Sequence, residues 1–412
     1  QVAGRENSNI FTMKSMSQRL IVSSVALFAL EAHSGFHGYR SSKNWLPRTP
    51  VITGATGVEL LSGRALPAGF DWRNVNGRSY VTTDLNQHIP QYCGACWIHG
   101  GTSTMNDRIK ILRRGRFPDV LLSRQALMNC VPDPSDPTKA NPGCMGGDAW
   151  MIFKYMHEHK VPDDTCMPYV AENQECAAIN VCRNCNHNLT TLADGSVRAV
   201  PGPCFAVPSY AGYGVRDYGN LSGEDAMMRE IYARGPIACN LAADDDFSNR
   251  YSSNAGVLSE NVYVTDRKYK TDDIDHVVEV AGWGETPSGL KYWIVRNSWG
   301  TYWGDMGWFK IRRGVNQQFI EFSCDWAVPD VQDVEAELHS QVLGDYVSGI
   351  TVKPLPAQLR QRSDENFQLT ASEGVLTTLS SLMVGFAGVA LGSVLTFIAS
   401  SRRMPQQPRL LG

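Results

Sequence analysis

The residues of this chain best suited to covalent chemistry are a cysteine, a histidine and an asparagine far apart in the sequence. Cys96 lies in the run 93–97, His276 follows an aspartate, and Asn297 begins the run Asn-Ser-Trp-Gly. A cysteine nucleophile needs a base that takes its proton and a group that orients this base, and such partners usually come from distant segments. We therefore predict that Cys96 attacks a carbonyl carbon, that His276 protonates the leaving amine, and that Asn297 holds the imidazole in position.

Neighbouring groups are expected to support this chemistry. A helix N-terminus and a nearby imidazolium both stabilise a thiolate and lower a thiol pKa to roughly 3–4, and Cys96 would lie at such a position. Gln87 would donate its side-chain amide to the developing oxyanion, together with the backbone N–H of Cys96. Trp299 would cover the hydrogen bond between His276 and Asn297 from water.

The segment after the predicted nucleophile has the pattern of a helix. From Trp97 to Leu112, apolar residues recur near helical spacing, which predicts a helix with Cys96 at its N-terminus. Gly100-Gly101 is unfavourable inside a helix, by roughly 1 kcal/mol per glycine relative to alanine. We therefore expect close packing of this helix against another element. His99 lies three residues after Cys96 and is expected to be a surface or core histidine outside the catalytic face.

The second half of the chain is predicted to be rich in strands. Three β-branched and aromatic runs, bounded by glycines, are typical of strands: residues 276–283, 292–295 and 308–311. A helix-rich half therefore precedes a sheet-rich half.

Eleven cysteines lie between residues 93 and 324. If Cys96 is free, the remaining ten can form five disulfides, a density typical of an oxidising compartment. The pairs Cys93-x-x-Cys96 and Cys182-x-x-Cys185 also have the spacing of zinc ligands, so zinc binding is the chemical alternative. The sequons at Asn188 and Asn220 are candidate glycosylation sites on surface loops.

The N-terminal residues have the pattern of a secretory signal. Basic residues precede the apolar run 20–30, and small or polar residues follow it, which predicts a signal peptide region over residues 1–34. Residues 35–65 are polar and rich in Pro, Gly, Ser and Arg, and they are predicted to form a short pro-segment. A globular domain is expected over residues 66–330.

The C-terminal part predicts attachment to a membrane. Residues 331–374 are polar and contain no cysteine, as in a stalk. Residues 375–401 contain no charged side chain, and as a helix they would extend about 40 Å, enough to cross a bilayer core of about 30 Å with tilt. Arginines follow, which predicts a cytosolic tail over residues 402–412 and a single-pass type I topology.

The charge and composition exclude one class of partner. The net charge of −3 gives no electrostatic basis for binding nucleic acid. A hydrophobic content of 43% and a charged content of 19% are typical of a globular protein.

Taken together, the motifs resemble the papain family of cysteine peptidases. The resemblance covers roughly residues 66–328 and occurs in the expected order in five segments: Phe70–Val75, Asn86–Trp97, Gly143–Gly147, Tyr218–Gly223 and Asp275–Gly300. It implies an α+β fold with a helical lobe that carries Cys96 and a β-barrel-like lobe that carries His276 and Asn297. Neither a cofactor nor a metal is implied.

The resemblance also implies a substrate site. His88-Ile89-Pro90 is an insertion of three residues relative to most family members. It implies that Gln87, before the insertion, is the oxyanion donor, with Gln91 as the rival assignment. A stiff loop on the primed side of the cleft would block longer chains, and a protonated His88 would pair with the terminal carboxylate of a substrate. The other expected substrate-binding residues are Tyr92, Gly146, Gly147 and Trp299.

Five disulfides are implied by the same resemblance. The expected pairs are Cys93–Cys144, Cys130–Cys176, Cys166–Cys182, Cys185–Cys204 and Cys239–Cys324. Ala95 replaces the usual serine before the nucleophile, which is a change between small residues. The family's short pro-region carries a cysteine that caps the nucleophile, whereas this chain has none before Cys93. The mode of latency is therefore open.

The sequence thus predicts a membrane-anchored lysosomal or vacuolar carboxypeptidase that acts on peptide and protein C-termini through a thioester on Cys96. A papain-like endopeptidase is the second hypothesis. A catalytically idle receptor ectodomain on the same scaffold is the third, although none of the catalytic residues is missing.

Overall fold

The computed structural model describes residues 38–41, 48–133, 143–252, 258–259, 261–331 and 341–349. The chain divides into two compact units, residues 1–363 and 364–412, and all described residues belong to the first. The predicted signal region, the membrane span 375–401 and the tail 402–412 lie outside the described residues, as does most of the stalk. Within the described ranges, every helix is too short or too polar to cross a bilayer.

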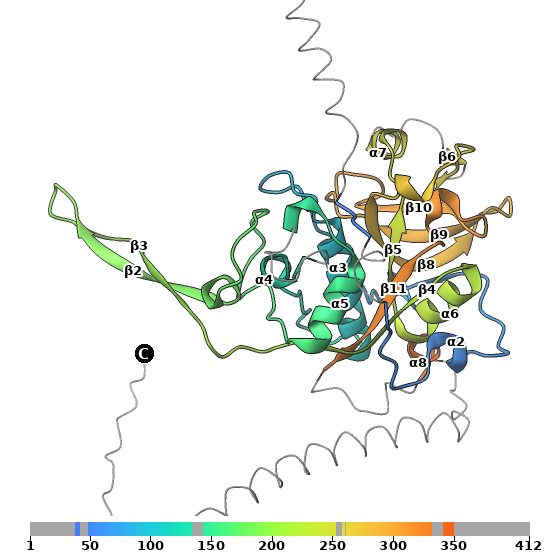
Figure 1. The fold of residues 1–412 in the computed structure, drawn as a ribbon, viewed down its shortest axis with the longest axis horizontal. Coiled ribbons are helices and arrows are strands. Elements are labelled where there is room, and N and C mark those ends of the chain that lie inside the picture. The colour runs from blue at the N-terminus through green and yellow to red at the C-terminus, as the bar shows by residue number, and fades with distance from the viewer. Residues whose placement is uncertain are drawn as a thin grey trace, which may run out of the picture. The chain divides into compact units, whose positions relative to one another are not determined.

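Three helices build one layer of this unit (Figure 1): α3 (Cys96–Leu112), α4 (Arg124–Cys130) and α5 (Ala149–Glu158). The Ser123 hydroxyl caps α4 by accepting the N–H of Ala126, and the Asp148 carboxylate caps α5 by accepting the N–H of Trp150. All but one residue of α3 is buried. The predicted helix after the nucleophile is confirmed, and it lies in the middle of the unit.

The paired glycines of α3 permit close packing on both sides of the helix. A Cβ atom added at Gly100 would lie 2.9 Å from Val277 Cγ1, and one added at Gly101 would lie 3.0 Å from Ile152 Cδ1. Gly100 therefore lets α3 approach the strand that begins at His276, which confirms the expected close contact. The low helix propensity of glycine is offset by this approach.

A nine-stranded sheet forms the second layer, in the order β4-β11-β5-β8-β9-β10-β7-β6, with β1 also paired to β8. Its strands are β1 (Phe70–Asp71), β4 (Gly214–Leu221), β5 (Ile237–Leu241), β6 (Leu258–Ser259), β7 (Val262–Tyr263), β8 (His276–Glu285), β9 (Lys291–Arg296), β10 (Trp308–Arg312) and β11 (Cys324–Asp330). The three predicted strands correspond to β8, β9 and β10. Nine of the ten residues of β8 are buried, because α3 covers it and strands flank it.

Short elements complete the unit. They are α2 (Gly57–Leu60), η2 (Gly143–Met145), η3 (Ala178–Asn180), α6 (Glu224–Arg234), α7 (Asp245–Ser252), η4 (Thr271–Asp273), η5 (Gln317–Phe319) and α8 (Leu343–Ser348). α6 contacts both α2 and α8. α2 has a capping box between Thr56 and Glu59, so part of the predicted pro-segment is folded onto the unit.

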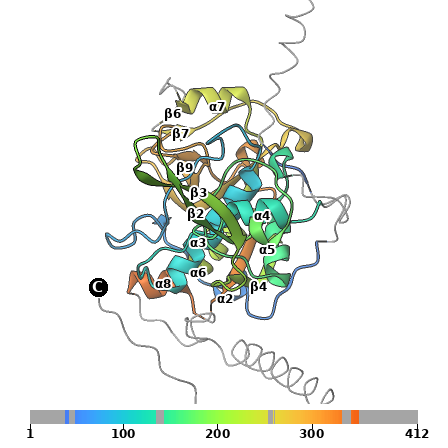
Figure 2. The same ribbon diagram turned by 90° about the vertical axis from the view of Figure 1, so that its left-hand side faces the viewer.

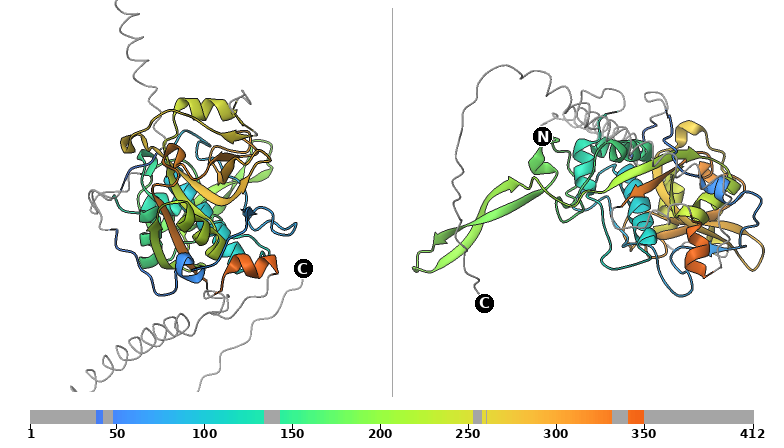
Figure 3. Two further views of the ribbon diagram at one scale, coloured as in Figure 1. Left: turned by 90° about the vertical axis from the view of Figure 1, so that its right-hand side faces the viewer. Right: turned by 90° about the horizontal axis from the view of Figure 1, so that it is seen from below.

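A long hairpin projects away from the two layers (Figures 1, 2 and 3). It consists of β2 (Arg183–Thr191) and β3 (Val197–Ala206), which pair only with each other. The sequence prediction missed this hairpin, although the Asp194-Gly195 turn between the strands was a usable signal. The candidate glycosylation site Asn188 is exposed on β2 and Asn220 is exposed on β4, so both lie in strands and not in the expected loops.

All five predicted disulfides are confirmed: Cys93–Cys144, Cys130–Cys176, Cys166–Cys182, Cys185–Cys204 and Cys239–Cys324. Cys96 is the free cysteine and is buried. Three of the four cysteines with zinc-ligand spacing are therefore in disulfides and have no thiolate to offer a metal.

Candidate active site

Cys96 is the first residue of α3, where backbone N–H groups have no partner within the helix. Its side chain is fully buried. The backbone N–H groups of Trp97 and Val277 both point to the sulfur and favour the thiolate. Since Val277 is the second residue of β8, the start of this strand lies against the thiol.

His276 and Asn297 come from neighbouring strands of the sheet. His276 is the first residue of β8, Asn297 follows the last residue of β9, and these strands are antiparallel. The Nε2 atom of His276 lies 2.8 Å from Oδ1 of Asn297. A carbonyl oxygen accepts, so Nε2 carries the proton and Nδ1 is left as the basic nitrogen.

Trp299 lies against this pair, as expected. Its ring stacks on the imidazole of His276, with centroids 4.9 Å apart and an interplanar angle of 28°. Trp299 is 5% exposed and Asn297 is 3% exposed. The hydrogen bond between His276 and Asn297 is thus held in a low-dielectric environment, where it orients the imidazole more strongly.

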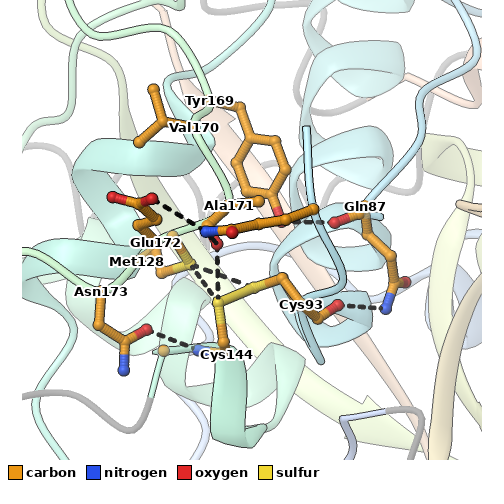
Figure 4. Close-up of a disulfide and its surroundings, with 12 residues drawn as sticks. Gln87, Cys93, Met128, Cys144, Tyr169, Val170, Ala171, Glu172 and Asn173 are labelled. Carbon is orange, nitrogen blue, oxygen red and sulfur yellow. Dashed lines mark hydrogen bonds between the residues drawn. A yellow bond between two sulfur atoms is a disulfide. The ribbon is translucent and has the colours of Figure 1, made fainter. Parts of the chain in front are cut away.

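Gln87 is buried behind the nucleophile loop (Figure 4). Its Nε2 atom donates to the carbonyl oxygen of Cys93 at 3.0 Å, and its Oε1 atom accepts from Ser298 Oγ at 2.7 Å. Its backbone carbonyl accepts from the Tyr169 hydroxyl at 2.8 Å. Gln87 is therefore fixed by contacts with both lobes. Its partner Cys93 lies three residues before Cys96 in the sequence.

Gln91, the rival oxyanion donor, points elsewhere. It is exposed, and its Nε2 atom donates to Glu172 Oε1 at 3.0 Å and to the carbonyl of Ala171 at 3.2 Å. Gln87 is buried and bonds to Cys93 and Ser298, which stand near Cys96 and Asn297 in the sequence, so these contacts favour it over Gln91.

The insertion places His88 in a column of aromatic rings. The His88 ring stacks on Tyr92 with centroids 4.6 Å apart and on Trp299 with centroids 6.4 Å apart. Its backbone N–H donates to Asn86 Oδ1 at 2.9 Å, which fixes the turn. Ile89 and Tyr92 are both largely exposed, so the rim of the site is apolar.

Gly146 and Gly147 come shortly after Cys144, the disulfide partner of Cys93. Gly146 has a φ of +94°, and a Cβ at Gly147 would lie 2.6 Å from the ring of Trp97. Only glycine fits at both positions, which leaves the backbone of Gly147 open to an extended chain.

Residues 38–40 of the same chain form hydrogen bonds with the backbone of Gly147. The N–H of Gly147 donates to the carbonyl of Gly38 at 3.0 Å, and its carbonyl accepts from Arg40 at 2.8 Å. On the other lobe, the N–H of Tyr39 donates to the carbonyl of Asp275 at 2.9 Å. Residues 38–40 thus bridge the two lobes next to Cys96, where extended peptide is expected to bind.

Residues 66–327 match the family described as papain family cysteine protease. The chain belongs to this family. It is 40% identical to cathepsin Z of Onchocerca volvulus over 64% of this chain and 78% of that protein. It is 27% identical to pro-cathepsin H of Bos taurus over 70% of this chain and 72% of that protein.

Solved structures show the same papain-family fold. A mite allergen structure, from work on Blo t 1 and Der p 1, has a TM-score of 0.50 and 25% identity over 69% of this chain and 76% of that chain. The proform of the ragweed pollen cysteine protease Amb a 11 has a TM-score of 0.51 and 22% identity over 74% of this chain and 78% of that chain. The protein is therefore a papain-family cysteine peptidase with an α+β fold.

One expectation for this papain-family site is wrong in the observed conformation. The pKa of the Cys96 thiol is raised, whereas the helix N-terminus was expected to lower it. Burial is the largest cause, and it outweighs the N–H groups of Val277 and Trp97. A Cβ at Gly38 would overlap the carbonyl of Gly94, so residues 38–40 lie directly on the nucleophile loop.

Asp275 and His99 are buried titratable groups beside the site. Burial raises the pKa of Asp275 to about 8, although its Oδ1 atom accepts the N–H of Ala243 at 2.8 Å. Burial lowers the pKa of His99 to about 3, and its Nδ1 atom lies 2.9 Å from the carbonyl of Ala95. His99 is thus a core histidine that bonds back to its own helix, as one of the expected alternatives had it.

Three contributors to this site were missed from the sequence: Ser298, Tyr169 and the Gly38-Tyr39 segment. Ser298 was part of a motif with no role assigned. No local sequence pattern indicates a role for Tyr169, because its contact with Gln87 joins residues 82 positions apart.

Proposed function

We propose that the protein is a cysteine-type carboxypeptidase that removes single C-terminal residues from peptides and proteins. Cys96 is the nucleophile, His276 the acid and base, Asn297 the orienting group and Gln87 the oxyanion donor. The 40% identity to cathepsin Z supports this proposal. The observation that carries it is the position of His88 in one stack with Trp299, which itself stacks on His276.

The proposed reaction has two steps. The thiolate of Cys96 attacks the carbonyl carbon of the last peptide bond, and the oxyanion is stabilised by Gln87 and by the N–H of Cys96. The imidazolium of His276 protonates the leaving nitrogen, so the C-terminal residue departs as a free amino acid. A water molecule then gives its proton to His276 and attacks the thioester, which releases the shortened acid and restores the thiol.

The preference for the last residue is assigned to His88. An imidazole free in water is protonated below a pKa of about 6.5, while a peptide C-terminus stays ionised above about 3.5. The two groups therefore form a charge-assisted hydrogen bond in acidic solution. Ile89 and Pro90 would fill the space that a longer substrate needs, and Gly147 would hold the substrate backbone.

A comparison of free-acid and C-terminally amidated peptides at acidic pH tests this proposal. We expect the free acid to lose one residue at a time and the amide to react at least about tenfold more slowly, because a charge-assisted bond is lost. In His88→Ala the two rates should become similar, whereas Cys96→Ala should be inactive on both. Equal rates on acid and amide in the unmodified enzyme would refute the role of His88.

End-group analysis separates the alternatives. Internal cleavage products would favour a papain-like endopeptidase. If a thiol-reactive peptide probe fails to label Cys96 after removal of the predicted pro-segment, an idle receptor on a peptidase scaffold becomes the better interpretation.

The proposed location is a lysosomal or vacuolar membrane, with the peptidase on the lumenal side as a single-pass type I protein. Five disulfides support an oxidising route of maturation. The uncharged run 375–401 supports the anchor. Alkaline carbonate extraction of membranes tests it, since an anchored chain stays in the pellet and a peripheral one is released.

A further inference from the structure

The loop that follows α3 is held by its own arginines. Arg113 donates from Nη1 to the carbonyl of Pro118 at 2.6 Å, and Arg116 donates from Nε to the carbonyl of Arg113 at 3.2 Å. From a neighbouring segment, Arg78 donates from Nη2 to the carbonyl of Gly115 at 2.7 Å. Residues 113–119, here called the arginine loop, are therefore fixed by bonds from guanidinium groups to backbone carbonyls.

This fixed loop presents a bare aromatic side chain to solvent. Phe117 is 91% exposed, the largest value for a large hydrophobic residue in the described part of the chain. Burying an apolar ring against another surface is favourable, so a partner that covers Phe117 gains binding free energy from it.

The surroundings of Phe117 are basic, although the protein is not. Lys110, Arg113, Arg114 and Arg116 lie within the ten residues that end at Asp119, the single acid of this stretch, while the whole chain has a charge of −3. Asp119 already pairs with Lys110 at 2.9 Å. Arg78 adds a further positive charge beside Gly115. A positive surface with an apolar tip fits an anionic partner that also accepts an aromatic ring.

The last described residues of the chain, in and after α8, lie beside the arginine loop. The guanidinium of Arg114 lies over the ring of Tyr346 in α8, 4.9 Å from its centroid, and Asn76 Nδ2 donates to the carbonyl of Ser348 at 3.2 Å. Figure 3 shows α8, in orange, at the edge of the unit. The described chain ends at Gly349, and the uncharged run begins at Val375, so about 25 residues, spanning at most roughly 80 Å, join them.

We propose that the arginine loop is a membrane-contacting surface that binds a lipid bilayer with anionic headgroups. Phe117 enters the interfacial region, and Arg116 and Arg78 bind headgroup phosphates or carboxylates. A sulfated polysaccharide would use the same charges, but it offers no apolar layer for Phe117. The inference takes its orientation from the proposed anchor, which raises the local concentration of lipid around the loop.

The test uses the full chain with 4-trifluoromethylphenylalanine in place of Phe117, reconstituted into bilayer nanodiscs. The discs contain phosphatidylcholine alone or mixed with phosphatidylserine, with and without a lipid that carries a spin label. We expect the ¹⁹F signal to broaden with the spin-labelled lipid in the anionic discs. The same label at Leu189 on β2, which is 68% exposed, serves as the control and should not broaden.

Charge variants make the result specific. Arg78→Gln and Arg116→Gln should each lower the ratio of docked to undocked loop about fivefold, while peptidase activity on a soluble peptide is unchanged. An unbroadened signal in anionic discs overturns the proposal, as does equal broadening in phosphatidylcholine alone. A shift on adding soluble heparin without any broadening by spin-labelled lipid also overturns it, in favour of a polysaccharide.

A separate experiment tests whether the proposed membrane anchor inserts into lipid. Flotation with phosphatidylcholine vesicles reports whether the run 375–401 inserts, because zwitterionic lipid offers no net charge to the arginine loop. If the chain does not float with these vesicles but its Phe117 signal broadens in anionic lipid, the proposed anchor is wrong. The proposed lipid-binding loop would then still stand.

Discussion

At the scale of single residues, the assignment of the oxyanion donor depends on Gln87. We predict that Gln87→Glu lowers kcat by roughly 10²–10³ with little change in KM, because the carboxylate can still accept from Ser298 but has no N–H to donate. Steady-state kinetics measure this effect. Gln91→Ala is the control and should stay near the unmodified rate, since Gln91 is exposed and bonds to Glu172 and Ala171. A large loss in both variants would contradict the assignment.

Asp275 gives a second prediction at this scale. Its pKa is about 8 in the fold and 3.8 in its ordinary state. Between these pH values the folded chain holds a proton that the unfolded chain releases, so this group makes stability fall as pH rises through the window.

In Asp275→Asn this fall should be reduced, by at least about 1 kcal/mol across the window. Thermal unfolding at pH 5 and pH 8 measures it, as the difference between variant and unmodified enzyme at each pH. The same pH slope in both proteins would show that Asp275 ionises normally.

At the scale of elements, the contact between α3 and β8 positions Cys96 and His276, the proposed nucleophile and base. A Cβ at Gly100 would meet both a side-chain atom of Val277 at 2.9 Å and its carbonyl oxygen at 3.3 Å. We predict that Gly100→Ala destabilises the fold by about 1–3 kcal/mol and lowers kcat, because β8 carries His276.

Gly101→Ala is the matched control for this prediction. Its added Cβ meets the mobile end of Ile152, and alanine favours the helix by roughly 1 kcal/mol over glycine. Denaturant unfolding of the two variants should therefore give a clear destabilisation only at Gly100. Equal stability of both would mean that α3 and β8 separate without cost.

At the scale of the whole molecule, residues 38–41 and 48–65 lie against the peptidase unit through buried ion pairs. Arg48 pairs with Asp148 and, at 3.0 Å, with Asp325, and its guanidinium lies 5.3 Å from the centroid of the Trp150 ring. Asp148 directly follows Gly147, the residue whose backbone is taken by Gly38 and Arg40. Arg48 therefore anchors the segment that covers the site, without any cysteine.

We predict that Arg48→Ala increases labelling of Cys96 by a thiol-reactive peptide probe in the unprocessed chain. Loss of one partner of a buried ion pair costs about 3–5 kcal/mol, which weakens the contact of residues 38–40 with both lobes. Arg64→Ala is the control, because Arg64 pairs with Asp345 and is 44% exposed. The prediction is contradicted if both variants label at the rate of the unmodified chain.

Local sequence patterns predicted one central helix and three strands of this protein. The helix after Cys96 and the strands β8, β9 and β10 follow from the spacing of apolar residues, which a chain must satisfy to bury one face. The proposed nucleophile, base and orienting residue follow from residue type, because few side chains can do this chemistry. The hairpin β2–β3 was missed because its strands are exposed on both faces and show no apolar alternation.

Other features were decided by tertiary structure alone. Gln87 and Gln91 have the same side chain four residues apart, and only the contacts with Ser298 and Tyr169 distinguish them. The pKa of the Cys96 thiol is raised because other segments bury it, and residue type gives no measure of burial. The covering of the site by Gly38 and Tyr39 depends on backbone hydrogen bonds, which any residue but proline can donate. The sequence therefore predicted which groups react, because residue type limits this chemistry, and the packing of distant segments decided how these groups are held and what covers them.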